Sequence, residues 1–266
     1  MSATERACGV VAYSTGNHAQ AAAKAAKDAG VKATIVMSPD APAAKVAGTR
    51  RWGARVVMAH PSSNARRALA ERLAQESGAL LIPPYDHPDI VAGQGTMGLE
   101  LLAQLQAEPP AAVYVPVGGG GLLAGIAVAI KACSPRTRVI GVEPELENDA
   151  CRSFSSGQLV TAEGPSASMA DAIKVQSLGT LNFELIRRCV DAFVTVGEAD
   201  IARAVLDCFE CNRLLVEPAG AVALAAARIH EPRAGHPAMA GRPVVAIVSG
   251  GNTTADFIQT LQAASP

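Results

Sequence analysis

Short apolar runs alternate with longer stretches of helical periodicity along almost the whole chain. The apolar runs are rich in Val and Ile and predict strands at 9–13, 33–37, 55–60, 79–84, 112–117, 138–143, 192–196 and 244–251. The stretches between them predict helices at 17–29, 43–52, 63–77, 88–105, 121–132, 198–212 and 218–229. β-branched runs separated by helices predict an α/β protein whose parallel sheets are covered by helices on both faces.

A proline-containing break at 108–110 predicts where this pattern divides. Four strand–helix units precede it, and the remaining units follow it. We therefore expect two domains, each an open, mostly parallel sheet flanked by helices. The small domain is predicted to cover residues 14–107, and the large domain residues 1–13 together with 108–266.

Composition and charge narrow the possible functions. Hydrophobic residues make up 49% of the 266 residues and the formal net charge is −1, so neither nucleic acid nor a membrane surface is indicated as a partner. No apolar run is long enough to span a membrane. The six cysteines lack the spacing of a disulfide framework, and Cys208 and Cys211 form a lone C-x-x-C within a predicted helix. We expect reduced thiols in a cytoplasmic protein.

Four consecutive glycines, Gly118–Gly121, lie between a predicted strand and a predicted helix. Unpaired N–H groups and the helix dipole at such a position favour an anion, and glycine permits positive φ and close approach of a ligand. Gly119, Gly121 and Ala124 also satisfy the G-x-G-x-x-A dinucleotide fingerprint, with Glu143 ending the next strand. The loop alone leaves a phosphorylated cofactor, a dinucleotide and a turn without a ligand as alternatives.

Two further polar segments follow predicted strands. Ser14–Gln20 (STGNHAQ) opens a helix after the first strand, and Ser249–Asn252 (SGGN) follows the last. The first offers hydroxyls and N–H groups of a helix start to an anion, and the second offers a neutral hydroxyl. An N-cap or an ordinary turn would explain part of each segment.

Taken together, S-T-G-N-H-A-Q, V-P-V-G-G-G-G-L-L-A-G, G-V-E-P, E-P-A-G-A and S-G-G-N occur in this order from about Cys8 onward. This set resembles the pyridoxal-phosphate enzymes of the tryptophan-synthase-β fold type, in particular the branch of threonine/serine dehydratases and serine racemases. The resemblance implies that Gly118, Gly119, Gly120 and Gly121 bind the cofactor phosphate. It also implies that Asn17 contacts the phenolic oxygen, Ser249 faces the pyridine nitrogen and Glu217 lies near the ring.

The same resemblance implies a substrate pocket and a cation site. Ser14, Thr15, Asn17 and His18 would bind the substrate carboxylate, with Thr15 as a candidate catalytic residue. Glu143, the carbonyl of Glu147 and Asp149 would bind Mg²⁺ or Ca²⁺ through hard oxygen ligands. A solvated acidic loop is the alternative for this last group.

The sequence departs from the family pattern in three places. These enzymes hold the cofactor as a Schiff base to a lysine in an S-x-K-x-R-G-A-type segment before the asparagine loop, whereas the first lysine here is Lys24. We therefore expect a truncated and catalytically inactive member. Thr15 occupies the position of a serine in racemizing relatives, which favours dehydration over racemization. Ala172 replaces a usual glycine, which leaves the exact substrate open.

The function implied by the resemblance is β-elimination from a small hydroxy-amino acid such as L-threonine or L-serine, giving a 2-oxo acid and ammonia. A homodimer is implied as well. Three alternatives remain: a serine or other amino-acid racemase, a non-catalytic ligand-binding relic, and an NAD-binding oxidoreductase.

Overall fold

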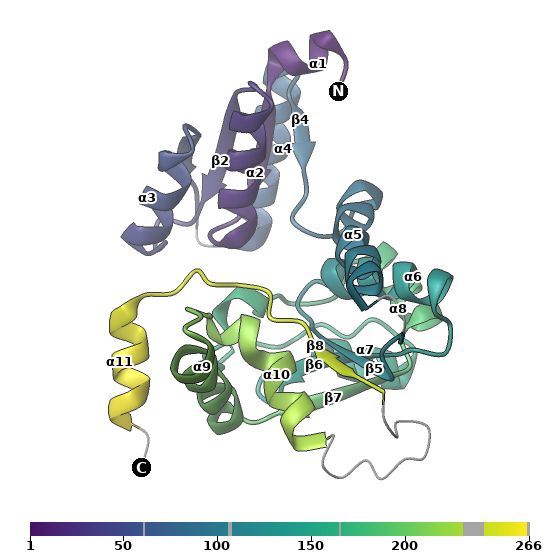
Figure 1. Ribbon diagram of the computed structural model, residues 1–266. Helices are drawn as coiled ribbons and strands as arrows, with labels where there is room; N and C mark the ends of the chain where they lie inside the picture. The colour runs from purple at the N-terminus through teal and green to yellow at the C-terminus, as the bar shows by residue number, and fades with distance from the viewer. Residues whose placement is uncertain (61, 106–107, 165, 231–241, 265–266) are drawn as a thin grey trace. The chain divides into compact units, whose positions relative to one another are not determined.

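The computed structural model describes residues 1–60, 62–105, 108–164, 166–230 and 242–264. The chain forms two compact units, Met1–Pro84 and Tyr85–Pro266. Each unit contains one four-stranded sheet in which every strand pairing is parallel, with helices on both faces (Figure 1). The predicted α/β class is confirmed.

The first unit contains four strands and four helices among its described residues. In chain order they are α1 (Ala3–Cys8), β1 (Val10–Tyr13), α2 (Asn17–Asp28), β2 (Ala33–Met37), α3 (Ala43–Arg51), β3 (Arg55–Met58), α4 (Ser63–Ser77) and β4 (Leu80–Ile82). The strand order is β3-β2-β1-β4. Ala12 and Ile35 pack with α2 and α3, whereas Val11 and Val36 pack with α4 on the opposite face. Alternate strand positions therefore fill two cores.

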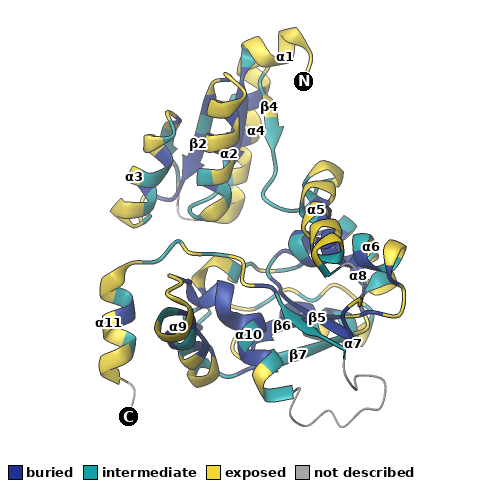
Figure 2. Ribbon diagram, viewed as in Figure 1, coloured by how far each residue is buried: buried dark blue, intermediate teal, exposed yellow. Residues whose placement is uncertain are grey.

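The second unit holds the glycine-rich loop. Its elements are α5 (Pro88–Leu105), β5 (Ala112–Pro116), α6 (Gly121–Cys133), β6 (Arg138–Pro144), α7 (Asp149–Ser156), the 3₁₀ turn η1 (Asp171–Ile173), α8 (Thr180–Cys189), β7 (Ala192–Val196), α9 (Glu198–Asn212), α10 (Pro218–His230), β8 (Val244–Ala246) and α11 (Ala255–Ala264). The strand order is β7-β6-β5-β8. Its central strands, β5 and β6, are buried almost throughout (Figure 2).

Two cores enclose this second sheet. Tyr114 and Val142 pack on the side of α9, α10 and α11, whereas Val113 and Val115 pack on the side of α5, α6 and α8. In the described part of the chain, no helix is both long enough and apolar enough to cross a membrane.

The structure corrects the predicted domain boundaries. Residues 10–13 form β1, which pairs with β2 and β4, so the start of the chain belongs to the first unit. Residues 88–105 form α5, which packs on α6 so closely that a Cβ on Gly125 would lie 2.3 Å from the Val91 carbonyl oxygen. Close packing between the two helices therefore assigns α5 to the second unit, although it precedes the predicted break.

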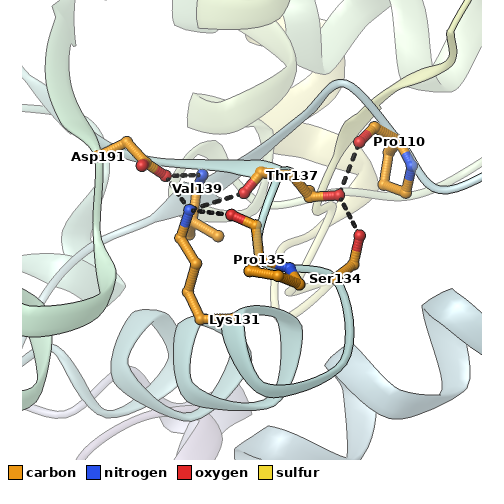
Figure 3. Close-up of polar contacts among 7 residues, drawn as sticks. All are labelled: Pro110, Lys131, Ser134, Pro135, Thr137, Val139 and Asp191. Carbon is orange, nitrogen blue, oxygen red and sulfur yellow. Dashed lines mark hydrogen bonds and ion pairs between the residues drawn. The ribbon is translucent and has the colours of Figure 1, made fainter.

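A polar network holds the C-terminal end of α6 (Figure 3). It lies at the amino ends of the strands, whereas the glycine loop follows the carboxyl end of β5. Lys131 Nζ lies 2.7 Å from Asp191 Oδ2 and donates to the Thr137 carbonyl at 2.8 Å. The same Asp191 oxygen accepts the Val139 N–H at 2.7 Å, and the Thr137 hydroxyl donates to the Pro110 carbonyl at 2.7 Å. The network ties α6 to the beginnings of β6 and β7.

Candidate functional site

The glycine loop Gly118–Gly121 connects β5 to α6, as predicted, and protein atoms occupy the space where side chains would lie. A Cβ on Gly119 would lie 2.3 Å from Cγ of Tyr85, and one on Gly118 would lie 3.1 Å from Cα of Ile173. Gly120 has φ of +88° and is the N-cap of α6. The chain's own packing therefore disfavours a side chain at Gly119 and Gly120, independently of any ligand.

The N–H groups of this loop are available to a ligand. Within the described residues, none of the N–H groups of Gly118–Gly121 donates to a protein acceptor, and no side chain caps α6. Gly119, Gly120 and Gly121 are buried. Buried amide donors at the positive end of a helix dipole bind anions, phosphate in particular.

Ser249 and Glu217 lie in segments that adjoin the same edge of the sheet. The strand β8 runs beside β5, and Ile247 N–H donates to the Tyr114 carbonyl at 2.9 Å, so the chain continues toward Ser249 next to the end of β5. Ser249 is exposed. Glu217 is buried, and its N–H donates to the Gly250 carbonyl at 2.9 Å. The second unit therefore gathers three of the predicted cofactor-binding segments.

The three predicted metal-binding residues are all buried at the end of β6 and the start of α7. The Glu143 carboxylate accepts the N–H groups of Ala150 at 3.2 Å and Cys151 at 2.6 Å, which caps α7. Asp149 Oδ2 is buried without a hydrogen-bond partner among the described residues. The described part of the chain contains no group of three or more His, Cys, Asp or Glu that could hold a metal ion. The cation site stays a prediction.

Burial changes the protonation of this acidic group. It raises the pKa of Glu143 to about 8, against the opposing effect of the Cys151 N–H, while the nearby Asp149 adds to the rise. It raises the pKa of Asp149 to about 6, with Glu147 contributing in the same direction. Burial therefore favours the protonated form of Glu143.

The predicted substrate-binding residues lie together in the first unit, between β1 and α2. Gly16 is the N-cap of α2, no side chain in the described part of the chain caps the helix, and its first turn carries no acidic residue. Ser14 Oγ accepts the Gly16 N–H at 3.2 Å, and Ser14 and Thr15 are half-buried. Asn17 is exposed at the first position of the helix. This is a second helix start suited to an anion.

His18 has a structural partner within this unit. Its Nε2 lies 3.3 Å from the Ile82 carbonyl oxygen at the end of β4. Burial lowers the pKa of His18, and the hydrogen bond to Ile82 opposes that shift. A neutral imidazole that donates to a carbonyl joins α2 to β4.

Two other residues singled out in the sequence lie on surfaces. Lys24 is ion-paired with Asp28 on α2 and lies 5.5 Å from the centre of the Trp52 ring. Ala172 is exposed in η1.

Cys208 and Cys211 are both free thiols, the first buried and the second exposed.

The structure adds three residues that the sequence analysis missed. Tyr85 lies against Gly119, Asp86 accepts the N–H groups of Thr180 and Asn182, and the Asn182 side chain donates to the Gly119 carbonyl. Asn182 is 63 positions from Gly119, and no local signal in the sequence connects the two.

Comparison with known proteins identifies the family. A family model described as pyridoxal-phosphate dependent enzyme matches residues 2–250. The chain belongs to this family. The loop fits the cofactor's phosphate, because its buried N–H groups have no acceptor among the described residues. The family match therefore decides against a dinucleotide.

Three relatives within the family illustrate the similarity. The chain is 41% identical to an L-threo-3-hydroxyaspartate ammonia-lyase from Saccharomyces cerevisiae, over 98% of this chain and 78% of that protein. A structure of maize serine racemase has a TM-score of 0.91 at 34% identity, covering 99% of this chain and 79% of that one. A crystal structure of a T.th. threonine deaminase has a TM-score of 0.87 at 44% identity, covering 95% and 80%. The predicted fold type and enzyme branch are confirmed.

Proposed function

We propose that this protein is an ammonia-lyase that uses pyridoxal phosphate to release ammonia and a 2-oxo acid from a small β-hydroxy-amino acid. The similarity to an L-threo-3-hydroxyaspartate ammonia-lyase and to a threonine deaminase supports this chemistry. One structural observation carries the cofactor part of the proposal. It is the row of N–H groups at Gly118–Gly121 that have no acceptor in the described part of the chain.

Pyridoxal phosphate, when bound, supplies an electron sink that stabilises the charge left when the Cα proton is removed. We assign its phosphate to the N–H groups of Gly118–Gly121. Ser249 would donate a hydrogen bond from its hydroxyl to the pyridine nitrogen, and Asn17 would donate one to the phenolic oxygen. Glu217 would lie beside the ring. A neutral hydroxyl does not hold the pyridine nitrogen protonated, which favours loss of a β-hydroxyl over transamination.

We assign the substrate carboxylate to the start of α2. Its first turn carries no acidic residue, and no side chain of the described residues caps it, so this helix start suits a carboxylate. Ser14, Asn17 and the backbone N–H of His18 would orient the carboxylate from the same turn. The hydroxyl of the half-buried Thr15 would hold or move a proton at the substrate.

The test measures cofactor binding and turnover separately in the purified protein. Pyridoxal phosphate is titrated into it, and ammonia and 2-oxo acid are then measured with L-threonine, L-serine and L-threo-3-hydroxyaspartate. The lyase assignment predicts saturable binding and equal amounts of the two products, whereas the absence of the Schiff-base lysine from the sequence predicts binding without product. Binding without ammonia release would reject the lyase assignment and support the sequence-based prediction of an inactive, ligand-binding protein. Absence of binding would reject the cofactor assignment as well.

The similarity to maize serine racemase makes racemization the second candidate. A racemase would invert L-serine without loss of the amine, whereas a lyase consumes it. Chiral chromatography of the same L-serine reactions separates the two activities. Net conversion to D-serine without ammonia would favour the racemase.

A further inference from the structure

We infer that Asn182 is the residue that positions the glycine loop for phosphate binding. The inference rests on the proposed cofactor. Asn182 is fully buried in the first turn of α8, with 0% of its surface exposed. It belongs to none of the predicted cofactor, substrate or metal sites.

The Asn182 side-chain amide uses both of its hydrogens on backbone carbonyls from two other segments. Nδ2 donates to the Gly119 carbonyl at 2.8 Å and to the Tyr85 carbonyl at 3.3 Å. A primary amide offers two donors in one plane, so the side chain can join two chain segments at once. Asn182 thus links the glycine loop to the segment that precedes α5.

The Gly119 carbonyl is held by a second donor from the same side. Gly179 N–H donates to it at 3.1 Å. The first turn of α8 is itself fixed, because Asp86 accepts the N–H groups of Thr180 at 3.0 Å and Asn182 at 3.3 Å. Hydrogen bonds to Asp86 therefore hold the backbone from which Gly179 N–H and the Asn182 side chain donate to Gly119.

Holding this carbonyl also aims the next N–H. No peptide bond among the described residues is cis, so the Gly119 C=O and the Gly120 N–H point in opposite directions across one planar group. Because the carbonyl points toward α8, the Gly120 N–H points away from α8. It donates to no acceptor among the described residues. Asn182 thereby directs one of the donors assigned to the phosphate.

Packing prevents the loop from relaxing in other ways. The Tyr85 ring lies where a Cβ on Gly119 would be, and a Cβ on Gly120 would lie 3.1 Å from Cβ of Asn182. Asn182 Oδ1, in contrast, is buried without a hydrogen-bond partner in the described part of the chain. An apolar side chain of similar size would fill the space without leaving a buried acceptor unpaired. The donor pair, and not volume alone, is what asparagine supplies at this position.

The test compares the affinity of the protein for pyridoxal phosphate with its affinity for pyridoxal, which lacks the phosphate. In Asn182→Leu, which keeps the branching at Cγ and removes both donors, we expect the affinity for pyridoxal phosphate to fall about tenfold. We expect the affinity for pyridoxal to stay unchanged. The matched control is Phe183→Leu on the same helix, which loosens packing but removes no hydrogen-bond donor to the loop, and it should leave the ratio of the two affinities as in the wild type.

Equal losses for both ligands in Asn182→Leu, or no loss for either, would overturn the positioning role. If that variant does not fold, Asn182→Thr, which retains one hydroxyl donor, decides the question, with a smaller loss expected for pyridoxal phosphate alone. If the wild type binds pyridoxal phosphate no better than pyridoxal, the proposed function fails at its phosphate site, and this inference fails with it. Normal wild-type binding with an unchanged ratio in the variant would overturn this inference only.

Discussion

Gly119 shows how much of the loop's sequence serves the protein's own structure. A side chain there would collide with the ring of Tyr85, and one at Gly121 would lie 3.0 Å from the Tyr85 carbonyl oxygen. Among the four glycines only Gly120 has positive φ. Close approach of a ligand was the expected reason for these glycines, but contacts inside the second unit already disfavour a side chain at Gly119 and Gly120. The proposed phosphate would use the N–H groups that this packing leaves without acceptors among the described residues.

His18 should make the stability of the first unit depend on pH. Its pKa in the folded protein lies below the unfolded value of 6.5, because the imidazole is buried. The unfolded state therefore binds the proton more readily. The free energy of unfolding should be at its full value above about pH 6.5 and should decrease as the pH falls toward the lower folded pKa.

The measurement is denaturant unfolding of the wild type and of His18→Gln between about pH 5 and about pH 8. Glutamine keeps an amide donor near Ile82 but does not titrate. The stability advantage of the wild type over this variant should shrink as the pH falls. A difference that is constant with pH would contradict the assignment.

Thr15 should influence which reaction the site performs. In Thr15→Ser the hydroxyl remains but the methyl group that restricts its rotation is removed. We expect the ratio of D-serine formed to ammonia released from L-serine to rise. Thr15→Val, which keeps the shape and removes the hydroxyl, is the control and should not raise it. The proton-transfer role assigned to Thr15 would be wrong if both variants gave the wild-type ratio.

Helix α6 has different tasks at its two ends. Its N-terminus carries the glycine loop and is capped by no side chain of the described residues, whereas Lys131 near its C-terminus pairs with Asp191. The N–H groups at the first end have no acceptor among the described residues, whereas hydrogen bonds within the protein fix the second end (Figure 3). Substitutions at the two ends should therefore have separable effects.

A carboxylate introduced at the open end should harm binding without harming the helix. Leu122 is half-buried in the first turn of α6. In Leu122→Glu the helix dipole would stabilise the new negative charge, but that charge would repel a phosphate. Relative to Leu122→Gln, we expect affinity for pyridoxal phosphate about tenfold lower and affinity for pyridoxal unchanged. Calorimetric titration measures both affinities. Equal affinities of the two variants for pyridoxal phosphate would argue against the assignment of its phosphate to Gly118–Gly121.

Removing the ion pair at the closed end should do the reverse. Lys131→Met keeps the aliphatic stem but removes the donor to Asp191 and to the Thr137 carbonyl. We expect a loss of about 1–2 kcal/mol in the free energy of unfolding, because the pair is partly exposed. The affinity for pyridoxal phosphate should not change. A large change in that affinity would show that the two ends of α6 are coupled.

Considered as a whole, the molecule was predictable where local sequence patterns determine the structure. The strand periods of Val113–Val117 and Val139–Val142 and the glycine loop between a strand and a helix all depend on neighbouring residues. The division into units was mispredicted, because the partners of β1 and the packing of α5 on α6 are non-local. The hydrogen bonds from Asn182 to Gly119 and Tyr85 were not predicted for the same reason. Predictions failed where distant segments meet.

The relative affinity of the wild-type protein for pyridoxal phosphate and for pyridoxal tests the central claim most directly. Several charge-assisted hydrogen bonds from buried N–H groups to one phosphate predict that pyridoxal phosphate binds at least about a hundredfold more tightly. Equilibrium titration of the two ligands under identical conditions measures this ratio. Equal affinities, or no binding of pyridoxal phosphate, would contradict the assignment of Gly118–Gly121 as its phosphate site.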